Sequence, residues 1–151
     1  MARRLIMSIL HFQPIKGQTR TILSVIMSTP EISSCCLEDI LTIRLTCEEI
    51  VANVVSYAYP EGTEDFLDVD IQKVAGSGGH HDNRIVIRFE DKGVPFNPLE
   101  HKKPDLSLPW IQRPIGGLGI YLILQKMDDV RYAYVDNRNV LTVEKKLYNN
   151  T

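Results

Sequence analysis

Apolar residues recur at helical spacing along one long stretch of this chain and alternate with polar residues along several shorter stretches. Over residues 37–58 they fall three or four positions apart, which predicts a long amphipathic helix with one side in a core. Weaker helical spacing over 16–28 predicts a first helix, and Pro30 ends that helix or the turn after it. The core-facing residues expected on the two helices are Ile22, Val25, Ile26, Ile40, Leu41, Cys47, Val51, Val54 and Val55.

Alternation of apolar and polar residues predicts β-strands before and after these helices. A glycine-rich segment at 75–83 predicts one hairpin, and polar residues 136–139 predict a second hairpin near the end of the chain. Residues 118–127 are interpreted as a short helix. The order is therefore strand, helix, helix, strand, strand, long loop, helix, strand, strand. The strands are expected at residues 4–12, 66–74, 84–90, 130–135 and 140–147.

The segment from 94 to 115 has no periodicity and holds five of the eight prolines. A structureless segment of this length is uncommon in a compact domain, and it is often a lid or a binding loop. It carries three cations, Lys102, Lys103 and Arg113.

Composition is that of an ordinary soluble domain and excludes some classes of function. The chain has 151 residues, 44% of them hydrophobic and 24% charged, which is enough for one domain, 1–151, with its own core. The net charge of −2 gives no broad basic surface, so we expect no direct nucleic-acid partner. No apolar run reaches the length that spans a membrane, so we expect no membrane partner.

The cysteines and the first residues both indicate a cytoplasmic protein. Three cysteines, two of them adjacent, make a poor disulfide framework and lack a zinc-binding spacing, so we expect free thiols. The apolar stretch near Met1 is short, contains Ser8 and is not followed by a small-residue cleavage site. We therefore interpret it as the first strand and not as a signal peptide.

Three polar patterns are candidates for chemistry, and the first lies on the long helix. Glu49 and Asn53 are four residues apart, so they share one side of that helix, and Tyr57 continues the stripe. Because this stripe adjoins the apolar one, its members are expected at the edge of the core. A carboxylate there can accept a proton, and an amide oxygen there can bind Mg2+. Taken alone, this face is more typical of ordinary solvated acids.

The second pattern is Asp91 with Gly93 at the end of a predicted strand. The carboxylate of Asp91 can accept a hydrogen bond from an adenine amino group, and the missing side chain at Gly93 would let the backbone approach the base. A plain turn at the end of a strand has the same composition, so these residues alone do not decide between the two readings.

The third pattern is Gly116-Gly117-Leu118-Gly119-Ile120 at the start of the predicted short helix. Free backbone N–H groups and the helix dipole favour an anion at such an end, and glycines let the anion come close. No strand leads directly into it and the chain has no P-loop motif, so it is neither of the common nucleotide fingerprints. A flexible hinge is the alternative. Taken together, and in the order in which they follow along the chain, the three patterns predict one nucleotide pocket.

Taken together, the three segments resemble the GHKL (histidine-kinase-like) ATP-binding superfamily, and most closely its anti-sigma-factor serine kinase branch. Residues 48–59 resemble the N-box of that branch, 90–98 its G1 box and 113–120 its G2 box, and the resemblance covers about 10–147. It implies an α+β fold, a two-layer sandwich with a mixed, mostly antiparallel sheet and helices on one face.

The resemblance also implies ATP and Mg2+ as cofactors and assigns roles to residues. By carry-over, Glu49 is the catalytic residue that activates an acceptor serine, Asn53 holds Mg2+ and Asp91 binds the adenine. Gly117 and Gly119 are expected at the phosphates. The further nucleotide contacts are expected at Tyr57, Gly93, Gly116, Leu118 and Ile120. The implied substrate is an anti-anti-sigma (STAS) protein, the other implied partner is a sigma factor, and the family suggests a homodimer.

The chain departs from the family pattern at two places that bear on the nucleotide. Tyr57 stands where the family often has histidine, and Asn139-Val140 stands where it usually has a Gly-Thr pair, so we assign no threonine contact to the adenine. Two functions stay open: a regulatory serine kinase, and a nucleotide-gated module that sequesters a partner without phosphotransfer. The ATP-binding half of a sensor histidine kinase ranks below both, because none of the four histidines lies in a long dimerising hairpin.

Overall fold

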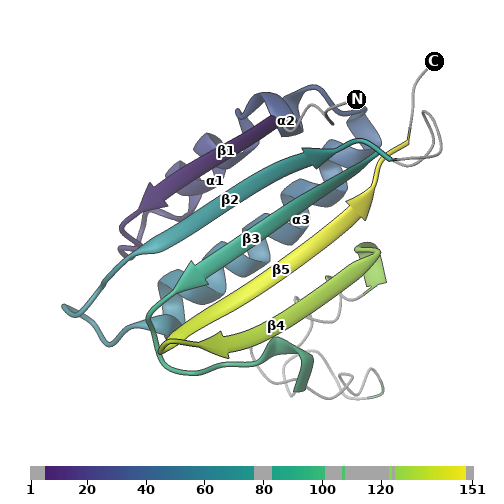
Figure 1. The fold of residues 1–151 in the computed structure, drawn as a ribbon. Helices are drawn as coiled ribbons and strands as arrows, with labels where there is room; N and C mark the ends of the chain where they lie inside the picture. The colour runs from purple at the N-terminus through teal and green to yellow at the C-terminus, as the bar shows by residue number, and fades with distance from the viewer. Residues whose placement is uncertain (1–5, 77–82, 101–106, 108–122, 124, 149–151) are drawn as a thin grey trace.

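The computed structural model describes residues 6–76, 83–100, 107, 123 and 125–148, and these residues form a five-stranded sheet with helices packed on it. The strands lie side by side in the order β1-β2-β3-β5-β4, and each of these pairings is antiparallel (Figure 1). The strands are β1 (Ile6–Phe12), β2 (Leu67–Val74), β3 (Arg84–Asp91), β4 (Asp129–Val135) and β5 (Arg138–Lys146).

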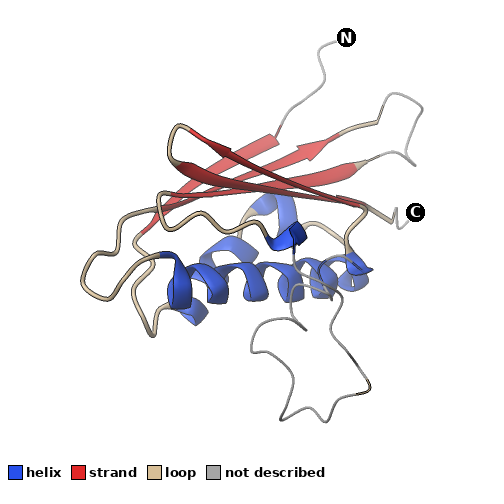
Figure 2. Cartoon of the chain, turned by 90° about the horizontal axis from the view of Figure 1, so that it is seen from below, coloured by secondary structure: helices blue, strands red, loops and turns tan. Residues whose placement is uncertain are grey.

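Helices cover one face of the sheet, which gives two layers (Figure 2). They are α1 (Thr19–Met27), α2 (Pro30–Ser33) and α3 (Leu37–Asn53), and α3 runs on directly into one π-helical turn, η1 (Val54–Ala58). The predicted α+β sandwich is therefore confirmed, and the sheet predicted as mostly antiparallel is antiparallel in all its described pairings. Pro30 begins α2, because proline fits the first position of a helix.

The core lies between the two layers. Ile43, Cys47 and Val51 of α3 are fully buried there. Two predicted core residues are exposed instead, Leu41 at 58% and Val25 at 41%. Both stand off the buried stripe of their helix: Leu41 lies two residues before Ile43, which turns it about 200° away around the axis. The sheet contributes Leu67, Val69, Ile71, Ile85, Ile87, Phe89 and Val143.

The connection between β4 and β5 is shorter than the predicted loop at 136–139. Asp136 and Asn137 alone form it, with φ angles of 53° and 60°. A two-residue type I′ turn requires such left-handed values, which Asp and Asn tolerate. β5 therefore begins at Arg138, and Asn139 becomes a strand residue paired with Asp91 of β3.

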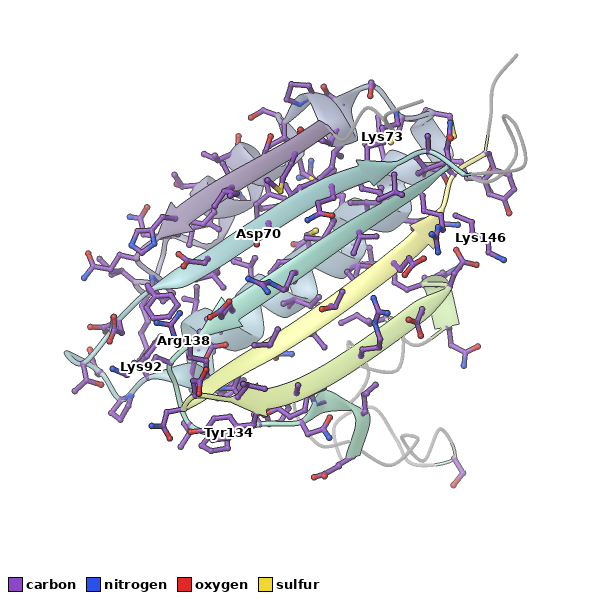
Figure 3. All side chains as sticks on the ribbon, in the orientation of Figure 1. Asp70, Lys73, Lys92, Tyr134, Arg138 and Lys146 are labelled. Carbon is purple, nitrogen blue, oxygen red and sulfur yellow. The ribbon has the colours of Figure 1, made fainter. Side chains whose placement is uncertain are left out.

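The second face of the sheet, which no described helix covers, carries ion pairs. Arg88 lies 3.3 Å from Asp70 and 3.1 Å from Glu90, and Arg138 lies 2.8 Å from Glu90. Figure 3 shows Asp70 and Arg138 on this face. A charged surface of this kind is stable in contact with water, although each exposed pair contributes little. None of the helices in the described part of the chain is both long and apolar enough to cross a membrane.

Candidate functional site

A cavity of about 200 Å3 lies where the end of α3 faces the ends of the central strands. Its wall is mostly apolar with a few polar side chains, a composition typical of small-molecule sites. Complete ligand pockets measure roughly 300–1,000 Å3, so this cavity fits one part of a ligand, such as a flat ring. The polar lining residues are Asn53, Tyr57, Asp91, Tyr132 and Asn139, and the apolar ones are Ile50, Val54, Ala58, Phe89, Val94, Pro95, Phe96, Pro98, Ile123 and Leu141.

Asp91 is the buried carboxylate of this cavity. It is the last residue of β3 and only 6% exposed. Its Oδ1 atom accepts hydrogen bonds from the backbone N–H of Gly93 at 2.9 Å and from the side-chain amide of Asn139 at 3.0 Å. Its Oδ2 atom has no hydrogen-bond partner among the described residues. Burial raises the pKa of Asp91, and the two hydrogen bonds oppose that rise. Oδ2 is thus the acceptor that this side chain can offer to a ligand.

Asn139 is a site residue that the sequence analysis placed in a turn. Its side chain is 6% exposed and makes hydrogen bonds with both ends of its amide. The acceptors of its N–H groups are Asp91 Oδ1 at 3.0 Å, the Val94 carbonyl at 3.0 Å and the Gly93 carbonyl at 3.3 Å. The donors to its carbonyl oxygen are the Phe96 N–H at 3.0 Å and the Tyr132 hydroxyl at 2.6 Å. The adjacent Asp-Asn pair at 136–137 was the available signal, because it marks a two-residue turn.

Gly93 is required by a close contact between the loop and the end of η1. A Cβ atom there would lie 2.7 Å from the carbonyl carbon of Ala58, and the Val94 N–H donates to that same carbonyl at 2.9 Å. The Tyr59 hydroxyl strengthens this junction, since it accepts from the Lys92 N–H at 2.7 Å. In this structure, therefore, helix packing explains the glycine, whereas the sequence analysis expected a base to approach it.

Asn53 and Tyr57 line the cavity from the helix side. Asn53 is half-buried at the last position of α3. Tyr57 is 60% exposed and lies in η1, so it borders the opening. A single π-helical turn of this kind occurs often at functional sites.

Glu49 lies one turn before Asn53 and outside the lining of the cavity. Its side chain is half-buried. Burial raises its pKa, and the neighbouring charge of Glu48 raises it further. A carboxylate with a pKa moved toward neutral is better suited to accept a proton at physiological pH. Glu49 can therefore act as a base next to the cavity without filling it.

The third predicted segment and the cations of the long loop lie outside the described residues. This applies to Gly116, Gly117, Leu118, Gly119 and Ile120, and to the loop cations Lys102, Lys103 and Arg113. Ile123, from the predicted short helix, is described: it is helical, 4% exposed and part of the cavity wall. One residue close after the glycine-rich segment thus meets the other two segments at the cavity.

The donor set at the cavity fits Mg2+ better than a transition metal. Within the described ranges, no group of three or more His, Cys, Asp or Glu side chains could hold a metal ion, and the three cysteines are free. The amide oxygen of Asn53 is a hard ligand on the cavity wall. Mg2+ usually takes one or two oxygen ligands from protein, most often carboxylates, and completes its shell with water and substrate phosphates.

Comparisons with known proteins agree with this geometry. A family model described as a histidine kinase-like ATPase domain matches residues 12–145. Over 108 residues the chain is 33% identical to the serine-protein kinase RsbW of Bacillus thuringiensis (strain Al Hakam) and to proteins of the same name from Bacillus cereus (strain 03BB102) and Bacillus anthracis. Each match covers 69% of this chain but 62% of the relative, so the chain spans less than two thirds of the length of these relatives.

Proposed function

The chain belongs to the histidine kinase-like ATPase domain family, as its motifs predicted, and we propose that it is an ATP-binding regulatory serine protein kinase of the anti-sigma-factor type. Its substrate is a serine of an anti-anti-sigma (STAS) protein, and its other partner is a sigma factor. The similarity to proteins named serine-protein kinase supports this assignment. The proposal places the protein in the cytoplasm, as a homodimer.

The observation that carries the proposal is the apolar cavity with one carboxylate oxygen at its wall to which no described residue donates a hydrogen bond. An adenine ring offers a flat apolar surface and an amino group that donates hydrogen bonds. Apolar residues such as Ile50, Phe89 and Leu141 match the ring, and Oδ2 of Asp91 matches the amino group. A hydrogen bond to a charged acceptor of this kind contributes about 1.5–3 kcal/mol.

The other end of ATP is assigned to the remaining motif residues. The amide oxygen of Asn53 would hold Mg2+, which would offset the negative charge of the triphosphate. Tyr57 is positioned at the opening of the cavity. The phosphates are assigned to Gly117 and Gly119, with further contacts from Gly116, Leu118 and Ile120, because the first turn of a helix favours anions.

Glu49 is assigned as the catalytic base. As the serine Oγ atom attacks the γ-phosphorus of ATP, Glu49 takes the hydroxyl proton, the new O–P bond forms and ADP leaves with the electrons of the broken bond. Loss of such a base slows a reaction by about 10²–10⁴-fold. Because Glu49 lies outside the cavity lining, its substitution is expected to spare nucleotide binding.

Calorimetry with ATP and ADP, with and without Mg2+, tests the binding site. Wild type is expected to bind both nucleotides, and Asp91→Asn to bind them about 10- to 100-fold more weakly, because the charged acceptor is lost. Arg88→Ala on the open face of the sheet is the control and leaves affinity unchanged. If wild type ignores adenine nucleotides, or if Asp91→Asn binds as tightly as wild type, the assignment is wrong.

Transfer of labelled phosphate to an anti-anti-sigma protein tests the reaction. Wild type is expected to label a serine, and Glu49→Gln to lose about 10²–10⁴ in rate at unchanged ATP affinity. Glu38→Gln is the matched control, since Glu38 is an exposed acid at the opposite end of the same helix. If control of the partner survives Glu49→Gln unaltered, the protein is a nucleotide-gated module that sequesters its partner.

A further inference from the structure

One side chain, that of Asn139, connects the base-binding carboxylate to two other parts of the cavity wall. We propose that Asn139 is a positioning residue that holds Asp91 by Oδ1, so that only Oδ2 is offered to the base and the site selects purines with a 6-amino group. This inference rests on the proposed ATP-binding function and names the residue that sets its base selectivity.

The first argument is the orientation of the Asp91 carboxylate. Oδ1 receives two hydrogen bonds, from the Gly93 N–H at 2.9 Å and from Asn139 at 3.0 Å. Rotation of the carboxylate would break both. Because Asp91 and Asn139 are each 6% exposed, water cannot readily replace a lost partner, and an unpaired buried group is costly.

The second argument is that the amide of Asn139 is itself fixed in one orientation. Its N–H groups face three oxygens, and its carbonyl oxygen faces two donors, the Phe96 N–H and the Tyr132 hydroxyl. A turned amide would place its oxygen against the Asp91 carboxylate and its N–H groups against the Phe96 N–H. The hydrogen-bond inventory of asparagine allows only the observed arrangement here.

The third argument is that the same amide fixes the wall on which the base would rest. Val94, Phe96 and Tyr132 each bond to Asn139 and each line the cavity. A carbonyl oxygen at position 6 of the purine would face Oδ2, and neither of these two acceptors can donate a hydrogen bond. A carboxylate held in one orientation cannot turn away from this contact. A 6-amino group is accepted because it donates. Rigidity of the pair is thus the source of selectivity.

Competition between ATP and ITP tests the inference, because ITP carries a carbonyl where ATP carries the amino group. Wild type is expected to prefer ATP by at least about tenfold, the fold-change of a hydrogen bond to a charged group. Asn139→Leu keeps a similar volume and removes all the amide bonds, so ATP affinity is expected to fall by about 10- to 100-fold and the preference for ATP to shrink. Tyr132→Phe removes one bond to Asn139, so a loss of about 2- to 10-fold in ATP affinity and a smaller preference for ATP over ITP are expected.

A titration of the Asp91 carboxyl carbon by NMR, without nucleotide, adds a readout that general destabilisation would not move. The bond from Asn139 lowers the pKa of Asp91 against the effect of burial. Asn139→Leu is therefore expected to move the titration of Asp91 to higher pH. As the solution is acidified, the variant is expected to lose its ATP affinity at a higher pH than wild type does. Ser8→Ala is the matched control. Ser8 in β1 donates a 2.8 Å hydrogen bond to the buried carboxylate of Glu31 in α2, and Ser8→Ala removes that bond. Neither residue lines the cavity.

The outcomes distinguish a failure of the role of Asn139 from a failure of the proposed ATP binding. An unchanged Asp91 titration together with an unchanged ATP-to-ITP ratio in Asn139→Leu overturns the role of Asn139, even if ATP binding is confirmed. If Asn139→Leu does not fold, Tyr132→Phe decides, and an unchanged ratio there overturns it. If wild type binds neither nucleotide, the proposed function fails, while the carboxyl titration still reports whether Asn139 holds Asp91.

Discussion

Each end of the long helix α3 lies near a buried aspartate, and the two carboxylates have partners of different charge. The C-terminal end of α3 faces the end of β3, and its N-terminal end lies toward the end of β5 (Figure 1). Asp91, near the C-terminal end of α3, accepts hydrogen bonds from neutral groups and has no ion pair with any described residue. Asp39, in the first turn of α3, is 0% exposed and lies 3.9 Å from Nζ of Lys145, which is itself 8% exposed.

This difference shows that burial alone does not mark a ligand-binding carboxylate. Asp39 has a structural role: it accepts from the Tyr148 N–H at 2.8 Å and from the Cys36 thiol at 3.3 Å, and it connects the start of α3 to the end of β5. Its charge is balanced by Lys145. Among the described residues no cation pairs with Asp91, and burial raises its pKa, so its carboxylate gains from a donor that enters the cavity.

The largest expected effect is a loss of stability when Asp39, the carboxylate at the N-terminal end of α3, is removed. Asp39→Ala leaves the Lys145 ammonium group buried with a partner that is more exposed to solvent, Asp128 Oδ2 at 3.7 Å. We expect a loss of about 3 kcal/mol in the free energy of unfolding, the low end for a broken buried pair, measured by urea denaturation. Asp128→Ala is the control and is expected to cost less than about 1 kcal/mol, because Asp128 is more exposed. Equal losses would mean that Asp39 is not the principal partner of Lys145.

A smaller loss of stability is expected at the cavity end from Gly93→Ala. The new methyl group would lie 2.7 Å from Ala58, so the loop must move away from η1. Overpacking of this kind costs about 1–3 kcal/mol, and the displaced Gly93 N–H would also weaken ATP binding. Gly62→Asn is the control for the loss of a glycine, since a Cβ at Gly62 meets nothing within 4 Å and asparagine tolerates the left-handed φ of 82° there. Unchanged stability in Gly93→Ala would show that the loop does not need its contact with Ala58.

The smallest expected effect is the pH dependence contributed by Asp91, the carboxylate of the cavity. The pKa of Asp91 is raised in the folded protein, so its favourable contribution is present below the ordinary aspartate pKa of 3.8 and is lost as pH rises through the folded value. Asp91→Asn removes this titration. The free energy of unfolding of the variant minus that of wild type should therefore increase with pH across that window, by about 1.4 kcal/mol for each unit of pKa shift. A flat difference would contradict the raised pKa.

Several elements could be predicted because the signal for each lies within a single stretch of sequence. The helical spacing over 37–58 predicted α3 together with η1, and the Glu49–Asn53–Tyr57 spacing predicted the stripe that borders the cavity. The pairing of Asp91 with Asn139 could not be found in this way, since it depends on where β5 begins. The two-residue turn at 136–137 sets that register, and a loop longer by two residues had been expected.

The amino-acid sequence by itself determined the two-layer α+β arrangement, the family and the residue types available for a nucleotide, because periodicity and motif order are local properties. Only the tertiary structure decided which oxygen of Asp91 receives no hydrogen bond from the described residues. It also decided why position 93 must be glycine and that Asp39 has a cation beside it. Those properties depend on contacts between segments distant in the chain, such as Gly93 with Ala58 and Asp39 with Lys145. Packing of the helix layer against the sheet brings these groups to within a few ångströms of each other.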